Sequence, residues 1–246
     1  MTRPADPASA SVWAELVGQD HAVETLARAA GASDVIRLPG AGPGHAMSHA
    51  WLITGPPGSG RSNAAKAFAA ALQCENRQTV VGPGCGQCNA CRTSLTGAHP
   101  DVTLVRTEQL SIGVDEVREL VRRASMRPTM GRRQILVVED ADRVTERGAD
   151  ALLKSIEEPA AKTVWVLCAP TADDVVATIR SRCRLLNLTT PSVPAVTALL
   201  EARDGFDPAI AAYAARAGQG HIGRARMRAR DEGARNRRHE VLQIPG

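Results

Sequence analysis

The sequence predicts an α/β protein, in which a mostly parallel sheet covered by helices is followed by a small helical domain. Short apolar runs alternate with helical patterns up to about residue 188, and this alternation is typical of parallel strands joined by crossover helices. A glycine-rich loop follows the first apolar run, where phosphate-binding loops are found. After the linker 189–194 only helical patterns remain. We therefore expect two domains, 1–188 and 189–246.

The first strands and helices are each supported by a local signal. A helix is expected from about 20 to 30, and the Gly/Pro-rich residues 31–45 predict a mobile loop. The alanine-rich segment 62–73 favours a helix, because alanine is the strongest helix former. In 114–125 the apolar residues recur at helical spacing and share one face. The strands expected between these segments are 50–54, 102–105 and 134–138.

The remaining elements continue the alternation and then become purely helical. A helix over 146–157 should stop before Pro159, because the residue that precedes a proline disfavours helical backbone angles. The elements expected next are a strand at 163–168, a helix or turn near 173–179 and a strand around 184–188. The second domain is expected to contain helices at 192–203, 208–217 and 221–240.

Length and composition indicate a protein with a substantial core and no membrane span. The chain has 246 residues, of which 43% are apolar, enough for one large domain and a smaller one. No apolar stretch approaches the ~20 residues that span a bilayer, and residues 1–11 lack the pattern of a signal peptide. We therefore expect a cytoplasmic protein without a membrane partner.

The net charge of +4 is concentrated near the end of the sequence. Seven arginines and three carboxylates occur between Arg224 and Glu240, so the rest of the chain is neutral overall. The first four of these arginines are two residues apart and alternate between opposite faces of a helix. This pattern favours a solvated helix surface, and a nucleic-acid patch is the alternative.

A phosphate-binding loop is expected directly after the first strand. The pattern G-x-x-x-x-G-K-[ST] is matched by Gly55, Gly60 and Ser62, with Gly58 inside the loop, but Arg61 replaces the lysine. Backbone N–H groups of such a loop, together with the start of the following helix, wrap the phosphates of a nucleotide. An arginine is a longer, planar fork than the compact lysine ammonium. The loop therefore predicts an NTPase fold, and Arg61 argues against ordinary hydrolysis.

Four of the six cysteines have the spacing of metal ligands. In a cytoplasmic chain such spacing favours a metal over disulfides, and four thiolates match the tetrahedral preference of Zn²⁺ with no open position. Such a zinc site would be structural. An iron–sulfur cluster and reduced, metal-free thiols are the alternatives, although no further cysteine lies close behind Cys91. The expected ligands are Cys74, Cys85, Cys88 and Cys91.

Taken in order, these motifs resemble the AAA+ clamp-loader subunits of the bacterial replicative DNA polymerase, over about 12–225. A phosphate loop alone would support many functions. The four-cysteine insertion, the A-L-L-K-x-x-E-E-P run that starts at Ala151 and the S-R-C triplet that starts at Ser181 are far more restrictive. The other matching segments are Leu16-Val17-Gly18-Gln19, His99-Pro100-Asp101, Gly131-Arg132-Arg133 and Thr178-Ile179. The resemblance implies an AAA+ P-loop NTPase domain with a parallel sheet and a zinc module, followed by a helical lid.

The resemblance also identifies the positions that hydrolyse ATP in the active members of the family, and this sequence departs from them. Arg61 stands at the position of the phosphate-loop lysine. Glu139-Asp140 reverses the usual Asp-Glu pair, so the longer carboxylate falls at the Mg²⁺ position and the shorter one at the position that polarises water. A displacement of about 1 Å at such positions costs ~100-fold in rate.

Two further positions depart from the active members. The polar sensor expected after the strand 163–168 falls at Ala169-Pro170, with Thr171 as a substitute. In the lid, Gly223 stands where an active subunit carries arginine, with Arg224 adjacent. The resemblance thus implies a decayed ATPase site: ATP and Mg²⁺ remain possible ligands, but no catalysis by the chain itself is expected.

Arg182 in the S-R-C triplet is intact. In the family this arginine reaches across a subunit interface to the ATP of a neighbour, where it acts as an arginine finger in trans. We expect it at an exposed junction between the last strand and the lid. From spacing alone, a structural arginine that pairs with a carboxylate is the alternative.

An intact finger beside a decayed site resembles the stator-type δ′ member of the family. The resemblance implies a non-catalytic subunit of the DNA polymerase III holoenzyme in the nucleoid, which helps load the sliding clamp on primed DNA with the δ and τ/γ subunits. An active τ/γ-type motor and an unrelated zinc-bearing AAA+ adaptor are the alternatives. Family members also carry a helical collar domain, which does not follow within these 246 residues.

Overall fold

The computed structural model describes residues 11–33, 47–77 and 83–231. The chain divides into two compact units, which are described separately. The first unit comprises 1–56 and 60–188, and the second comprises 57–59 and 189–246. None of the helices in the described ranges is long and apolar enough to cross a membrane.

A five-stranded parallel sheet forms the centre of the first unit. The strand order is β2-β3-β4-β1-β5, so the strand that precedes the phosphate loop lies between β4 and β5. The central strands β1, β3 and β4 are buried along their whole length, as continuous apolar runs predict. The strands are β1 (Ala50–Thr54), β2 (Val102–Val105), β3 (Gln134–Val138), β4 (Thr163–Ala169) and β5 (Arg184–Asn187).

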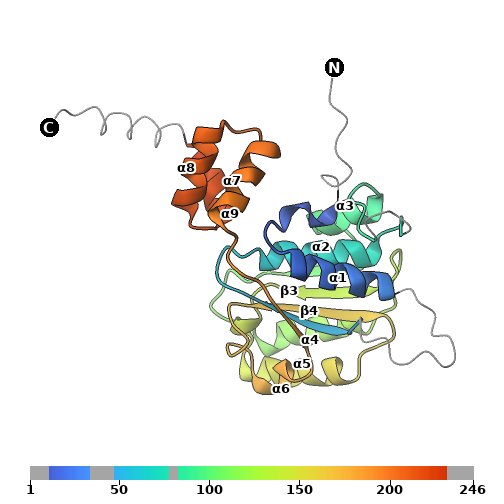
Figure 1. Cartoon of the computed structure of the whole chain (residues 1–246). Coiled ribbons are helices and arrows are strands. Elements are labelled where there is room, and N and C mark those ends of the chain that lie inside the picture. The colour runs from blue at the N-terminus through green and yellow to red at the C-terminus, as the bar shows by residue number, and fades with distance from the viewer. Residues whose placement is uncertain (1–10, 34–46, 78–82, 232–246) are drawn as a thin grey trace, which may run out of the picture. The chain divides into compact units, whose positions relative to one another are not determined.

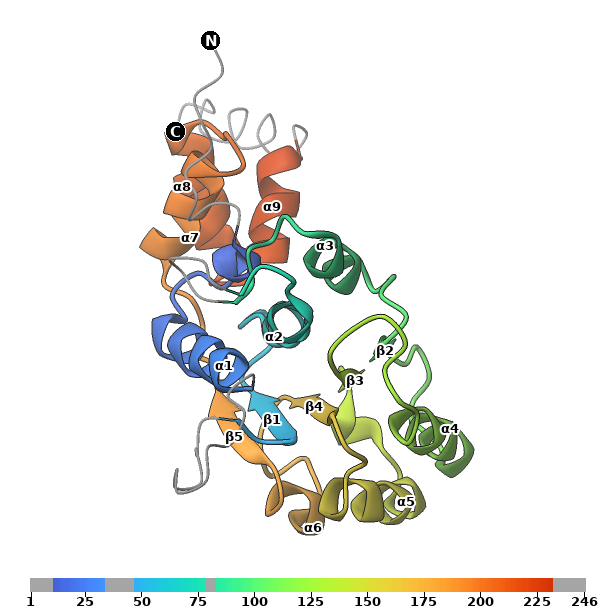
Figure 2. The ribbon, with the colours of Figure 1, turned by 90° about the vertical axis from the view of Figure 1, so that its right-hand side faces the viewer.

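Helices cover both faces of this sheet (Figures 1 and 2). One face carries α1, α2 and α3, which share a core that includes Phe68 and Leu72. The other face carries α4, α5 and α6, which share a second core around Leu152 and Trp165. The helices are α1 (Asp20–Ala32), α2 (Arg61–Gln73), α3 (Asn89–Thr96), α4 (Val114–Ala124), α5 (Glu146–Glu157) and α6 (Ala177–Arg180). The predicted α/β class with a parallel sheet is therefore confirmed.

Three short elements of the first unit differ from the sequence-based expectation. Helix α3 was not expected, because the residues around its cysteines lack an apolar period. Its first turn is capped by Cys88, whose sulfur accepts the N–H of Cys91, and its end is capped by Gly97 at φ 76°. Short 3-10 turns also occur at Val12–Glu15 (η2) and Ala141–Arg143 (η3). Most of the loop expected at 31–45 lies outside the described residues.

The second unit contains three helices within its described residues: α7 (Val193–Ala202), α8 (Pro208–Gly218) and α9 (Ile222–Arg230). Ser192 and Asp207 cap the starts of α7 and α8 with side-chain oxygens. An ion pair between Arg226 and Asp204, at 2.7 Å, ties α9 to the turn after α7. The third helix ends at Arg230 rather than 240, since Asp231 has extended angles and residues 232–240 lie outside the description.

Candidate functional site

The carboxyl ends of three strands bring the expected nucleotide-site residues to one edge of the sheet. In the sheet register Thr54 pairs with Ala169, and Val138 pairs with Leu167. Gly55 follows the first of these strands and Glu139 follows β3, so both lie at this edge. The N–H of Gly55 donates to the carbonyl of Pro170 at 3.0 Å. Ligands of open parallel sheets bind at such an edge.

The glycines of the phosphate loop have the backbone angles that the motif requires. Gly58 and Gly60 have φ angles of 89° and 96°, in a region that side-chain-bearing residues rarely adopt. Gly60 is the N-cap of α2, and Arg61 and Ser62 lie in the first turn of this helix. The Arg61 guanidinium donates to the carbonyl of Gly55, so it is folded back onto the start of its own loop.

Both carboxylates expected at the catalytic positions have partners within the first unit. The Oε1 atom of Glu139 lies 3.1 Å from the Nζ atom of Lys66, and the Glu139 side chain is only 8% exposed. The Oδ2 atom of Asp140 accepts the backbone N–H of Thr107 at 3.2 Å. Burial and the neighbouring Glu139 raise the pKa of Cys168 to about 12, so this thiol stays neutral. The charged partner of Glu139 is therefore Lys66. Lys66 was missed by the sequence motif.

The residues at the expected sensor positions make local contacts. The hydroxyl of Thr171 donates to Asp174 at 2.9 Å, within its own turn. Gly223 and Arg224 lie in the first turn of α9 in the second unit, where His221 accepts the N–H of Arg224.

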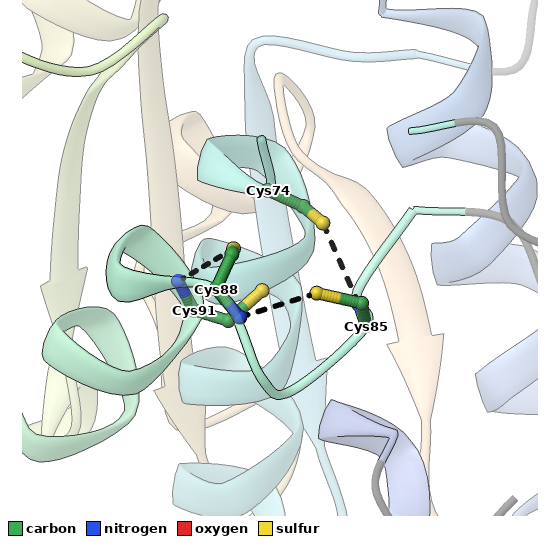
Figure 3. A group of neighbouring side chains, drawn as sticks. All are labelled: Cys74, Cys85, Cys88 and Cys91. Atoms are coloured by element: carbon green, nitrogen blue, oxygen red, sulfur yellow. Dashed lines mark hydrogen bonds between the residues drawn. The ribbon is translucent and has the colours of Figure 1, made fainter. Parts of the chain in front are cut away.

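The four expected zinc ligands lie together beside α2 (Figure 3). Cys74 ends α2, Cys85 comes from the following loop, and Cys88 and Cys91 belong to the start of α3. Their sulfur atoms all lie within 4.8 Å of one another. In a tetrahedral zinc site with Zn–S distances of about 2.3 Å the sulfurs are about 3.8 Å apart, so a small contraction would complete the site. The cluster can hold a tetrahedral metal ion.

Backbone groups around the cluster also favour negative charge on its sulfurs. The N–H groups of Cys85, Cys88 and Cys91 point at the sulfurs of Cys74, Cys85 and Cys88, at 3.4–3.5 Å. Burial raises the pKa of Cys85, but N–H groups of Cys88 and Gln87 lower it more, to about 7. Burial raises the pKa of Cys74 and of Cys91, so these two need a cation to become thiolates.

Arg182 lies in the turn between α6 and β5. The expectation of a junction between the last strand and the lid is wrong: the triplet precedes the strand instead of following it. Because the strands are parallel, Arg182 lies at the edge opposite to the phosphate loop. Its side chain is 39% exposed, its Nη2 atom lies 2.5 Å from Oε1 of Glu157, and its Nη1 atom donates to the Thr178 carbonyl at 2.8 Å.

A cavity of about 400 Å³ lies beside the cysteine module. It is lined by α3, by the end of α2 and by the loops that precede β2 and β3, including His99 and Arg132. These loops lead into strands, so the cavity opens at the edge away from the phosphate loop. It is therefore separate from the candidate nucleotide site.

Comparison with known proteins identifies the family. A family model described as "DNA polymerase III, delta subunit" matches residues 41–192, which is more than half of the chain. The chain belongs to this family. The δ′ subunit of Pseudomonas aeruginosa DNA polymerase III is 38% identical over 138 residues, 55% of this chain and 42% of that protein. The δ′ subunit of Escherichia coli is 37% identical over 153 residues, 61% of this chain and 44% of that protein.

The resemblance to the δ′ clamp-loader family is therefore confirmed, although the chain spans less than half the length of these curated relatives. The gamma/tau subunit of Mycobacterium tuberculosis is also similar, with 33% identity over 171 residues, 69% of this chain and 27% of that protein. Among solved structures, a variant of RuvB from Thermotoga maritima matches with a TM-score of 0.63 and 17% identity, over 94% of this chain and 67% of that one. This likeness supports the AAA+ fold expected from the sequence.

Proposed function

We propose that the chain is the δ′, stator-type subunit of a DNA polymerase III clamp loader. It would help load the sliding clamp on primed DNA by donating Arg182 to the ATP of a neighbouring subunit. The observation that carries the proposal is a contrast between the two edges of the sheet. Arg61 and Glu139 bond to groups at the candidate nucleotide edge itself, and the Glu139 side chain is buried. Arg182 is 39% exposed at the opposite edge, although it also pairs with Glu157.

The chemistry of Arg182 suits such a role. A guanidinium that reaches the γ-phosphate of a bound ATP stabilises the charge that develops during phosphoryl transfer. Glu157 and the Thr178 carbonyl hold two of the guanidinium nitrogens, which fixes the direction of the side chain before a partner arrives. We assign Glu157 as a positioning residue for the finger, since it bonds to Arg182 and to no other residue that this proposal uses.

The partners and the remaining sites follow from the same proposal. The partners would be the τ/γ and δ subunits, and through the assembled complex the sliding clamp and primed DNA, in the cytoplasm at the bacterial nucleoid. Residues 1–188 would form the nucleotide-binding-type domain and 189–246 the lid. The four cysteines would hold one structural Zn²⁺, which stabilises the module around α3 without taking part in nucleotide chemistry.

The test is ATP hydrolysis by a clamp loader assembled with a full-length version of this subunit. Arg182→Ala should lower the clamp- and DNA-stimulated rate of the partner subunits by ~10³-fold at the site it serves. Arg182→Lys should restore it only in part, because a point charge does not reproduce the planar fork. The matched control is Arg180→Ala, since Arg180 lies two residues away, is 38% exposed and pairs with Asp173.

Three readings of this experiment are distinguishable. A specific loss in Arg182→Ala, with assembly and zinc content intact and Arg180→Ala active, supports the finger. Wild-type clamp loading by Arg182→Ala contradicts it. Failure of Arg182→Ala to assemble also contradicts it, because the arginine would then have a structural role.

An active motor of the τ/γ type is the second candidate function. The match to the gamma/tau subunit supports it, because that match covers more of this chain than the δ′ matches do. ATP turnover by the isolated chain separates the two candidates. Membership of the family argues against the third interpretation, an adaptor unrelated to replication.

A further inference from the structure

The ion pair between Lys66 and Glu139 lies at the candidate nucleotide edge and involves a buried carboxylate, and the sequence motifs did not anticipate it. Glu139 follows β3, and its side chain is 8% exposed. Lys66 projects from α2, is 31% exposed, and brings its Nζ atom to 3.1 Å from the carboxylate. A carboxylate so deeply buried requires a cation or a proton, because desolvation of an unpaired charge is costly.

Glu139 stands at the position where an active P-loop NTPase binds its metal. There, Mg²⁺ is held by the hydroxyl of the loop Ser/Thr and by the carboxylate that follows the Walker B strand. In this chain those positions are Ser62 and Glu139. Ser62 and Lys66 are four residues apart on α2, so they share one face of the helix. The lysine ammonium thus comes from the same helix face as the Ser62 hydroxyl, and it pairs with Glu139.

We propose that Lys66 is a built-in counter-ion that takes the place of the divalent cation at Glu139. The residues present then do not fit Mg²⁺, although both oxygen ligands are retained. A divalent cation at this carboxylate would have to break the ion pair with Lys66. The ammonium would still lie nearby and would repel the metal, because both are positively charged. The lysine ammonium therefore excludes a divalent cation from Glu139, and this inference is independent of the role of Arg182.

Removal of the lysine charge should allow a divalent cation to bind at Glu139. Without the ammonium, Glu139 becomes an unpaired buried carboxylate, and a second carboxylate, Asp140, follows it in the chain. Oxygen ligands of this kind are those that Mg²⁺ and Mn²⁺ prefer. Lys66→Met keeps the length and apolar stem of the side chain, so it should open a metal site with little change in packing.

The experiment is a titration of the zinc-loaded chain with Mn²⁺ alone, followed by electron paramagnetic resonance of the free ion. We expect Lys66→Met to bind Mn²⁺ at least tenfold more tightly than the wild type. The double variant Lys66→Met/Glu139→Gln should return to the wild-type affinity, since the carboxylate is the ligand that the lysine had covered. Lys154→Met, which removes an exposed lysine on α5, is the matched control and should behave as the wild type.

Two results would overturn the proposal. One is a wild-type Mn²⁺ site that disappears in Glu139→Gln, because the lysine would then not exclude the metal. The other is a Lys66→Met protein that is folded by circular dichroism and gains no Mn²⁺ affinity. If Lys66→Met does not fold, Lys66→Gln replaces it with the same expected result.

Discussion

At the scale of single residues, charged groups of the candidate nucleotide site bond to other groups of the same chain. Arg61 bonds to the carbonyl of Gly55, and Lys66 bonds to Glu139. In an active loop the corresponding cation and carboxylate face the phosphates and the metal. Each replacement is small in chemical terms, since arginine is still a cation and glutamate is still a carboxylate. The contacts, however, direct both groups at the protein itself.

The cysteine cluster gives the first prediction at this scale. Cys88→Ser should reduce the zinc content from about one equivalent per chain to less than about half, and should lower the unfolding temperature. Serine is a good N-cap, so the variant keeps the cap of α3 that Cys88 provides and loses only the thiolate. Elemental analysis of freshly purified protein and a thermal melt measure the two effects.

Cys183→Ser is the control for this experiment, because Cys183 lies outside the cluster. It should keep the wild-type zinc content. A full equivalent of zinc in Cys88→Ser, or iron in the wild-type protein, would contradict the assignment.

At the scale of elements, one buried carboxylate organises the loop that leads into β3. Asp101, which is 2% exposed, accepts the N–H groups of Thr129, Met130 and Gly131 and the hydroxyl of Thr129. Burial raises the pKa of Asp101, but these hydrogen bonds lower it more, so its pKa lies below the ordinary value of 3.8. The loop is therefore fixed to the start of β2 by an ionised group.

Asp101→Asn should destabilise the chain by about 2–4 kcal/mol, because an amide presents a donor to N–H groups that need an acceptor. The depressed pKa sets the pH dependence of this difference. The carboxylate contributes fully above pH 3.8, its unfolded pKa, and its contribution is lost as the pH falls through the lower folded pKa. Urea unfolding of both proteins across this range measures it.

The matched control is Asp115→Asn on α4, because the Asp115 side chain is 90% exposed and pairs only with Arg118 across one helical turn. Its effect should stay within about 0.5 kcal/mol. An equal loss in both variants, or an Asp101 effect that grows as the pH falls below 3.8, would show that the hydrogen bonds do not stabilise the loop as described.

The strands of the sheet could be predicted from the sequence almost to the residue. Strands β1, β2 and β3 have the expected bounds. For β1 and β3 the reason is that a fully buried strand is a continuous apolar run, which here is followed by glycine or a charged residue. Helix α3 could not be predicted in this way. Its buried face is made of cysteine and small residues, and the fold of this segment is determined by the cluster rather than by an apolar period.

In the candidate site, the residues that belong to sequence motifs could be predicted, but the residues that they contact could not. The phosphate loop, the cysteines and the triplet around Arg182 are patterns in the sequence, and the structure gathers the first two as expected. The partners of these residues are not patterns. Lys66 and Glu139 are far apart along the chain, and so are Arg182 and Glu157; each pair is brought together only by the packing of helices on the sheet.

At the scale of the whole molecule, charged groups at the candidate nucleotide edge of the first unit bond to other groups of the chain, and Arg182 is partly exposed at the opposite edge. Under the proposed function, such a unit would complete a neighbour's site in an assembly of similar subunits without turning over ATP itself. The family match and the δ′ relatives are consistent with this arrangement. The central claim is therefore that the chain lacks an ATPase activity of its own.

Steady-state hydrolysis of ATP by the isolated chain, with saturating Mg²⁺, tests this claim most directly. The account predicts turnover at the level of the buffer blank, and no difference between the wild type and Ser62→Ala, since no metal-dependent chemistry relies on that hydroxyl. Turnover in the ordinary enzymatic range of ~1 s⁻¹ or above, abolished by Ser62→Ala, would contradict the account and identify the chain as an active motor subunit.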